Sequence, residues 1–158
     1  MGIGFRNLYN MDVQFSRPSR HDLSIILELL GRQFQEHQIE VPEAALSSAV
    51  EAMLADIRLG FFLLAQTGEQ NVGLACVSFC WTLEHGGKSA WLDELYVLPE
   101  HRSRGIGGLL IEEVLKEAKE LGCAAVDLEV DIEHHRAERL YKRYGFEALP
   151  RSRWAREI

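Results

Sequence analysis

The sequence predicts a single mixed α/β domain, and three observations lead to this prediction. Stretches in which apolar and polar residues alternate are interspersed with stretches in which apolar residues recur every three or four positions. The 158 residues are enough for one domain with its own core and too few for two of ordinary size. No repeat, linker or low-complexity tract divides the chain. We therefore expect one domain over residues 12–158 and a flexible N-terminal extension over residues 1–11.

The first half of the chain predicts a short strand, two helices and two longer strands. Apolar residues at helical spacing, preceded by Ser19 or Asp22 as an N-cap, indicate the first helix. Pro42 suits the first turn of the second helix, since proline is tolerated there. Glycine and asparagine around residues 68–71 mark a turn between the longer strands. The predicted ranges are a strand over 12–15, helices over 22–34 and 41–54, and strands over 61–65 and 72–82.

The second half predicts a strand, a helix, a strand and a final helix. Residues 90–97 are rich in strand-forming side chains, and apolar residues then recur at helical spacing up to Leu121. Gly122 stands where a left-handed helix C-cap is expected. Residues 124–130 alternate as a half-buried strand, a helix covers about 134–144, and Trp154 to Ile158 can add one last edge strand.

A glycine-rich turn, Arg102 to Gly108, lies between the strand ending at Val97 and the following helix. The start of a helix presents unpaired backbone N–H groups and the positive end of the helix dipole, so it binds phosphate readily. A P-loop would need Lys and Ser or Thr after Gly108, and a dinucleotide fingerprint would need glycine at position 110; leucine occupies positions 109 and 110. The turn therefore predicts an anionic cofactor of another kind.

Two motifs resemble those of the GNAT (GCN5-related N-acetyltransferase) superfamily. Arg102, Gly105 and Gly107 fit the pattern Arg/Gln-x-x-Gly-x-Gly/Ala of its pyrophosphate loop. Residues 137–146, AERLYKRYGF, fit the pattern Ala-x-x-Leu-Tyr-x-x-x-Gly-Phe. The resemblance implies the GNAT fold, in which a central, mostly antiparallel sheet of six to seven strands is flanked by about four helices.

The resemblance also implies acetyl-CoA as the acyl donor and no metal. The main chain of Leu95, Tyr96 and Val97 would pair with the pantetheine arm, and the loop would bind the pyrophosphate. His134 stands where relatives often carry an asparagine that contacts the cofactor arm. The implied cofactor-binding residues of the loop are Arg102, Ser103, Arg104, Gly105, Ile106, Gly107 and Gly108. Arg102 and Arg104 would either hold phosphate or solvate the loop.

Acetyl transfer to an amine needs a base for the amine proton and an acid for the departing thiolate. By resemblance, Tyr141 is the acid; the alternative is a tyrosine that only packs in the core. Asp93 and Glu94 are candidates for the base, and as neighbours on a strand they should point to opposite faces, so only one would face the substrate. In several relatives a carboxylate four residues before the strand-ending valine acts as the base through a water, so the resemblance favours Asp93, with Glu94 second, while both could also be ordinary exposed acids.

The predicted function is acetyl-CoA-dependent N-acetylation of a primary amine on a small molecule that is polyamine-like, amino-acid-like or aminoglycoside-like. One alternative acceptor is a protein N-terminus or lysine. Another alternative is a non-catalytic acyl-CoA-binding regulatory module, but that reading predicts loss of the acid and base positions, whereas Tyr141 and Asp93 are both present.

Composition limits the remaining partners. A net charge of −7 argues against nucleic acid, because affinity for nucleic acid depends on neutralising phosphates. No apolar run reaches membrane-spanning length and no signal peptide is evident, so we expect a cytoplasmic protein without a membrane partner. The three cysteines have no further ligands nearby and should be reduced thiols rather than a metal site. By analogy with relatives, a homodimer is possible.

Overall fold

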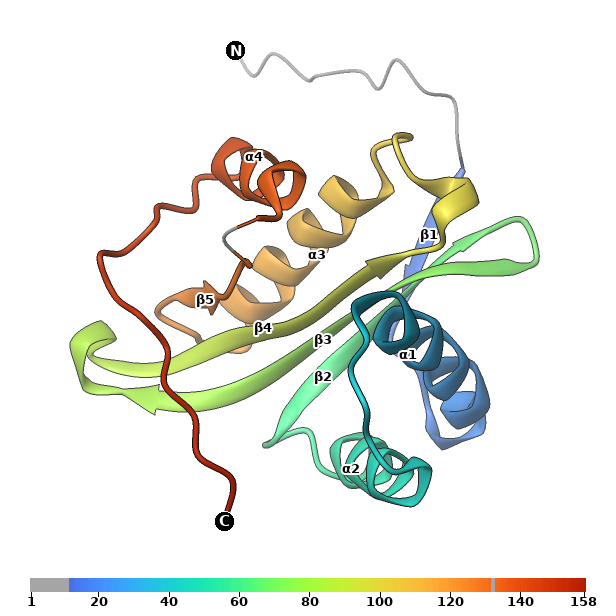
Figure 1. The fold of residues 1–158 in the computed structure, drawn as a ribbon, viewed down its shortest axis with the longest axis horizontal. Helices are drawn as coiled ribbons and strands as arrows, with labels where there is room; N and C mark the ends of the chain where they lie inside the picture. Colours follow the sequence, from blue (N-terminus) through green and yellow to red (C-terminus); the bar gives the residue numbers. More distant parts are fainter. Residues whose placement is uncertain (1–11, 132) are drawn as a thin grey trace.

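A computed structural model describes residues 12–131 and 133–158, so the extension predicted for residues 1–11 lies outside the described residues. Helices and strands follow each other in the predicted order (Figure 1). Their bounds are β1 Val13–Ser16, α1 Leu23–His37, α2 Glu43–Ala55, β2 Gly60–Thr67, β3 Gln70–Thr82, β4 Gly87–Val97, α3 Ile106–Glu120, β5 Val126–Leu128 and α4 His135–Arg143, with 3-10 turns at Arg20–Asp22, Leu83–His85 and Pro99–His101.

The strands form one mixed sheet in the order β1-β2-β3-β4-β5. The first four strands pair antiparallel through short turns, and β5 pairs parallel to β4. A parallel pair needs a crossover connection, and α3 provides it. Gly122, with a φ of 79°, ends this connection in the left-handed conformation expected of a helix C-cap.

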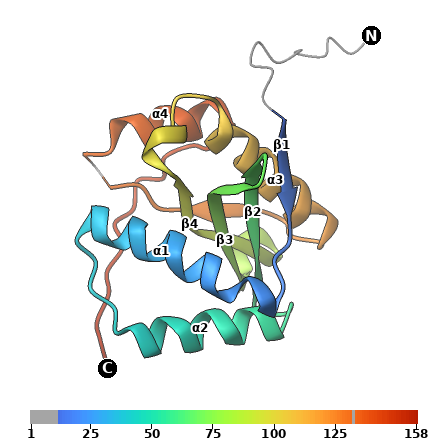
Figure 2. The same cartoon turned by 90° about the vertical axis from the view of Figure 1, so that its right-hand side faces the viewer.

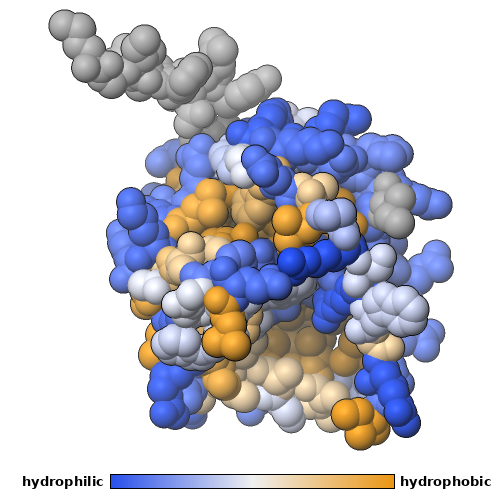
Figure 3. Space-filling view, turned by 90° about the vertical axis from the view of Figure 1, so that its left-hand side faces the viewer, coloured by the Kyte–Doolittle hydropathy of each residue, from blue (hydrophilic) through white to orange (hydrophobic). Residues whose placement is uncertain are grey.

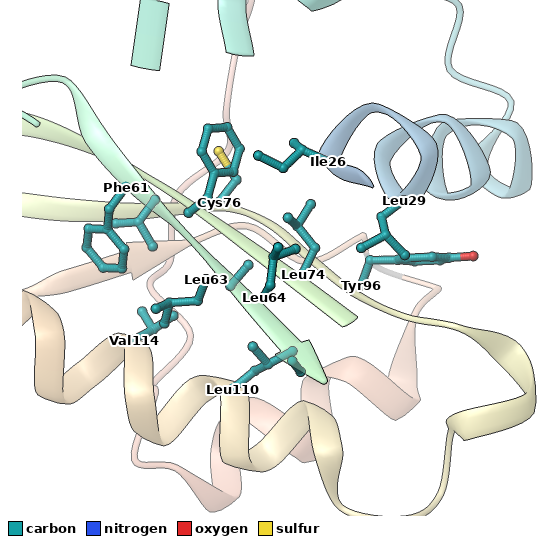
Figure 4. Close-up of a cluster of buried hydrophobic side chains, with 14 of the residues drawn as sticks. Ile26, Leu29, Phe61, Leu63, Leu64, Leu74, Cys76, Tyr96, Leu110 and Val114 are labelled. Carbon is teal, nitrogen blue, oxygen red and sulfur yellow. The ribbon is translucent and has the colours of Figure 1, made fainter. Parts of the chain in front are cut away.

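Helices cover both faces of the sheet. α1 and α2 lie on one face, while α3 and α4 lie on the other (Figures 1 and 2). Figure 4 shows the core in two layers, with Ile26 and Leu29 of α1 above the sheet and Leu110 and Val114 of α3 below it. The buried residues of α3 recur at helical spacing, as its sequence pattern predicts. No helix in the described ranges is long and apolar enough to cross a membrane.

The sheet has five strands in the described residues rather than the six to seven expected. The predicted edge strand over Trp154 to Ile158 is wrong, because the chain after α4 forms no strand. Pro150 lacks a donor for a strand ladder. Arg151 and Arg153 instead pair with Glu84 and Glu129, and the tail crosses β4 and β3 as an irregular segment (Figure 1).

The strand predicted over residues 124–130 is shorter, covering only Val126–Leu128. Its pairing with β4 ends at Leu92 and Leu128. At the next residue of β4 the register against β3 shifts, since Cys76 opposes Glu94 while Val77 opposes Leu92. Asp93 is therefore the extra residue of a β-bulge, and beyond it β4 and β5 are no longer paired.

Candidate active site

The predicted phosphate turn is built by backbone conformation. Ser103 and Gly105 both have positive φ, 64° and 85°, and Gly105 is the N-cap of α3. A serine in this region is uncommon, so the turn is held by its surroundings. After this turn the first N–H groups of α3 have no acceptor inside the helix and face outward from its positive end. The loop is thus preorganised for an anion.

The two glycines in the first turn of α3 have different neighbours. A Cβ added at Gly108 would lie 2.2 Å from Oη of Tyr144, so the ring of Tyr144, which follows α4, would have to move aside. A Cβ at Gly107 would make only ordinary contacts, 3.6 Å from Leu140 and 4.0 Å from Val97. Packing therefore explains Gly108, whereas nothing in the described protein requires glycine at position 107. A ligand that approaches the backbone closely would explain why position 107 is a glycine.

Two further arginines lie at the loop, and neither was singled out from the sequence. Arg136, in the first turn of α4, donates from Nη2 to Oγ of Ser103 at 2.8 Å. Arg143 lines a hollow of about 300 Å³ together with Gly105, Gly108, Leu140 and Tyr144. The signal for both was present in the signature helix, where basic residues recur between its apolar positions. With the exposed Arg104, they place positive charge around the turn.

Arg102 has partners outside the phosphate turn. Its Nε donates to the carbonyl oxygen of Val97 at 2.8 Å, and Nη2 pairs with Oε2 of Glu36 on α1 at 2.6 Å. The guanidinium also stacks over the ring of Tyr96, 5.4 Å from its centroid. In this structure Arg102 ties the end of β4 to α1, and it does not extend along the phosphate turn.

The bulge at Asp93 leaves part of β4 without a partner on one side. β3 pairs with β4 as far as Val97, whereas β5 pairs with it only as far as Leu92. Leu95, Tyr96 and Val97, the residues expected to bind the pantetheine arm, lie in the part that β5 leaves unpaired. An unpaired strand edge is a template for an extended ligand. The phosphate turn follows this edge directly along the chain.

Only the main chain of Tyr96 lies at this edge. Its side chain is buried on the α1 face, and Oη donates to Oε1 of Glu36 at 2.6 Å. Burial, followed by the neighbouring Glu36, raises the pKa of Tyr96 to about 12. The phenol is therefore part of the packing between β4 and α1.

The expectation that Asp93 and Glu94 point to opposite faces is wrong. The bulge interrupts the alternation of β4, because two of its residues occupy the space of one. Glu94 opposes Cys76, whose thiol contacts Met53 of α2, and Asp93 lies close enough to Ser78, on the same face of β3, for Ser78 to lower its pKa. Both carboxylates therefore face the side of the sheet that α1 and α2 cover.

The two carboxylates have raised pKa values. Burial, and then the charge of Asp93, raises the pKa of Glu94 to about 7, while a hydrogen bond from Gln33 acts in the opposite direction. Nε2 of Gln33 donates to Oε2 of Glu94 at 2.6 Å. Asp93 is exposed as a residue, yet partial burial of its carboxyl raises its pKa against the hydrogen bond from Ser78 and the charge of Arg153. Gln33 was not identified from the sequence.

Tyr141 lies close enough to Glu94 for the two to interact. The phenol is half-buried, and its ring packs edge-on against Phe146 at a centroid distance of 5.8 Å. Burial, followed by the charge of Glu94, raises the pKa of Tyr141 to about 12, so the phenol keeps its proton at neutral pH. The structure thus brings the three predicted catalytic residues into one region.

The two helix layers also meet at this region. The exposed ring of His134, just before α4, lies 6.0 Å from the ring of His37 at the end of α1, centroid to centroid. His134 is thus an exposed residue at the start of α4, next to the end of α1. Among the described residues no group of three or more His, Cys, Asp and Glu side chains is placed to hold a metal, and the three cysteines are free thiols.

Comparisons with known proteins agree on one family. The sequence profile of the Acetyltransferase (GNAT) family matches residues 23–146. The thialysine N-epsilon-acetyltransferase of Bos taurus is 38% identical over 138 residues, which cover 80% of this chain and 77% of that protein. An uncharacterized N-acetyltransferase of Methanocaldococcus jannaschii is 36% identical over 88 residues, 56% of this chain but only 39% of that protein. An aminoglycoside N-acetyltransferase solved with CoA has the same fold, with a TM-score of 0.78 at 19% identity over 96% of this chain and 99% of that one.

Proposed function

Because the chain belongs to the acetyltransferase (GNAT) family and is an N-acetyltransferase, we propose that it transfers the acetyl group of acetyl-CoA to a primary amine of a small molecule. One observation carries this proposal. The unpaired edge of β4, two carboxylates and a protonated phenol adjoin a helix N-terminus that is preorganised for phosphate.

The loop residues fit the anionic part of acetyl-CoA. Gly107 leaves room for a ligand against the backbone, and the N–H groups at the start of α3 provide donors. Arg104, Arg136 and Arg143 supply positive charge around them. The main chain of Leu95 to Val97 would hold the pantetheine arm, with His134 beside it. When bound, acetyl-CoA supplies an acetyl thioester as the acyl donor.

We assign Glu94 as the base ahead of Asp93, reversing the order that the sequence favoured. A general base works best when its pKa lies near the operating pH, and the pKa of Glu94 is raised to about 7. Oε2 accepts the hydrogen bond from Gln33, so Oε1 is the oxygen that takes the proton from the incoming ammonium group. Glu94 must be ionised to do this, so kcat/KM should rise as the pH increases through about 7.

Tyr141 is the acid in this proposal. As the amine nitrogen bonds to the acetyl carbon and the carbon–sulfur bond breaks, Oη of Tyr141 gives its proton to the leaving thiolate. Its pKa of about 12 keeps the phenol protonated over the working range. The nitrogen loses its second proton as it becomes the amide nitrogen, and the phenolate of Tyr141, which is strongly basic because of the high pKa, takes up that proton.

The acceptor we propose is an amine on a flexible chain. Asp93 and Glu94 face it with negative charge, which attracts an ammonium group. The Bos taurus relative is a thialysine N-epsilon-acetyltransferase, and this favours the amino-acid-like members of the acceptor class. We also propose a cytoplasmic homodimer. Trp81 and Leu83, 81% and 96% exposed on the β3–β4 hairpin, offer apolar surface for it, on the side of the molecule where Figure 3 shows apolar groups among polar ones.

The test is release of CoA thiol from acetyl-CoA by the purified protein with a panel of acceptors. The panel holds thialysine, lysine, diamines, an aminoglycoside and a lysine-rich peptide. Release that depends on a small amine supports the proposal, and release with the peptide alone would favour a protein acceptor. Binding of acetyl-CoA without release in any mixture would favour a non-catalytic module.

A further inference from the structure

Gln33 interrupts the apolar face of α1. Ile26, Leu29 and Leu30 are buried on this face, and the helical repeat brings position 33 to the same side. Gln33 is only 7% exposed and is one of two buried polar residues among those described. An amide buried in an apolar layer lowers stability unless its polar atoms have partners. A leucine or methionine would fill this position without that cost.

The amide is only half satisfied. Nε2 donates to Oε2 of Glu94 at 2.6 Å, whereas Oε1 is buried and has no hydrogen-bond partner in the described part of the chain. A buried acceptor without a donor is unfavourable. Glu94 is therefore the one polar partner that accounts for an amide at this position.

Glu94 lies between one neighbouring acid and two neutral groups. Asp93 stands next to it on β4, the buried thiol of Cys76 faces it from β3, and Tyr141 approaches from α4. The ion pair of Glu36 with Arg102 lies one turn of α1 further on. Burial and the charge of Asp93 favour the neutral carboxylic acid, and the amide of Gln33 favours the ionised carboxylate.

We propose that Gln33 is a positioning residue that holds the carboxyl group of Glu94 in place in both of its charge states. This rests on the proposed function, in which Glu94 takes a proton from the acceptor. With Glu94 ionised, Nε2 donates to it, as the structure shows. With Glu94 protonated, rotation of the amide by 180° exchanges its two ends, and Oε1 accepts the hydrogen of the carboxylic acid.

This exchange explains why Oε1 of Gln33 has no partner while Glu94 is ionised. Oε1 acquires a donor only when Glu94 carries a proton, so each charge state of Glu94 satisfies one end of the same amide. The carboxyl group then gains and loses its proton without swinging away from the acceptor. A side chain that only donates hydrogen bonds, such as lysine, would stabilise only the ionised form of Glu94. An apolar side chain would stabilise neither form, so burial and the charge of Asp93 alone would set the pKa of Glu94.

The test uses two substitutions that should move the titration of Glu94 in opposite directions. Gln33→Met keeps the length and removes both hydrogen bonds; because the bond to the ionised carboxylate is charge-assisted and the stronger of the two, the pKa of Glu94 should rise by about one unit. Gln33→Lys supplies a positively charged donor, so the pKa should fall by about one unit or more. Gln35→Met, on the exposed side of the same helix, is the matched control and should change nothing.

Two readouts separate this proposal from a merely structural role. The carboxyl carbon of Glu94, assigned with Glu94→Gln, is titrated by NMR in 13C-glutamate-labelled protein, and the acidic limb of kcat/KM is measured against pH. Opposite shifts in both readouts support the proposal, and an unmoved titration in the folded variants overturns it.

The NMR titration needs no turnover, so it tests Gln33 even if every acceptor fails. If the titration shifts while the acidic limb of kcat/KM stays in place, Glu94 does not take the proton. That outcome overturns the proposal and leaves acetyl transfer standing. If Gln33→Met does not fold, as thermal unfolding would show, Gln33→Lys alone decides: a fall of the pKa in both readouts supports the proposal, and an unmoved titration overturns it.

Discussion

Substituting two adjacent glycines with alanine should separate cofactor binding from folding. Gly107 and Gly108 both lie in the first turn of α3, and neither has the positive φ that would itself require glycine. An added Cβ meets ordinary van der Waals contact at Gly107 and a clash at Gly108. We therefore expect Gly107→Ala to impair binding of acetyl-CoA and Gly108→Ala to impair folding.

The magnitudes follow from these contacts. At position 107 the nearest atoms, on Leu140 and Val97, lie at 3.6 and 4.0 Å, so alanine should stabilise the helix by about 0.5 kcal/mol through reduced backbone entropy. At position 108 three atoms of Tyr144 lie within 3.1 Å of the added Cβ, so the ring of Tyr144 must shift away from α3. Overpacking of this kind costs about 1 to 3 kcal/mol.

The assays are thermal unfolding without ligand and calorimetric titration with acetyl-CoA. Gly107→Ala should unfold at or slightly above the temperature of the parent protein and bind acetyl-CoA at least about tenfold more weakly, a loss of about 1.4 kcal/mol. Gly108→Ala should unfold several degrees lower. Unchanged affinity in Gly107→Ala would refute the phosphate assignment. Early unfolding of Gly107→Ala would show instead that the glycine serves packing.

Three further predictions concern the catalytic groups and the loop. Tyr141→Phe should reduce kcat more than about tenfold with unchanged calorimetric affinity for acetyl-CoA, since only the proton donor is lost. Normal turnover would show that Tyr141 is not the general acid. Glu94→Gln should abolish the acidic limb of the kcat/KM profile, whereas Asp93→Asn should move that limb to lower pH, because the charge of Asp93 raises the pKa of Glu94; the reverse pattern would make Asp93 the base. Arg102→Met should change acetyl-CoA affinity less than Arg104→Met does, because Arg102 is engaged with Val97 and Glu36; equal losses by calorimetry would place both arginines on phosphate.

The sequence patterns predicted the elements well where the information is local. Helical periodicity located α1 to α4 to within a few residues, and single residues such as Gly122 marked their ends. The errors concern pairing between strands. The tail near Trp154 has strand-forming residues, but its arginines find carboxylates on the β3–β4 hairpin and after β5, and this could not be read from the tail alone.

The candidate site shows the same limit. The glycine turn and Tyr141 stood out because each belongs to a contiguous motif. The bulge at Asp93 depends on how β4 lies against β3, so the strand alternation predicted opposite faces for two carboxylates that share one face. Gln33 is 61 positions away from Glu94 in the chain, and only the packing of α1 on the sheet brings the two together.

Asp93 is an extra residue in β4, and the residues on either side of it keep the same alternation of faces relative to β3. Leu92 before Asp93 and Leu95 after Glu94 oppose Val77 and Ala75, which share one face of β3, so the core on the α3 side continues across the bulge without a mismatch. Removing Asp93 as a whole residue would therefore leave each flanking side chain on its present face and allow β4 to run straight along β5. One residue thus marks the point where β4 loses its partner β5, and this change is independent of the apolar pattern that folds the protein.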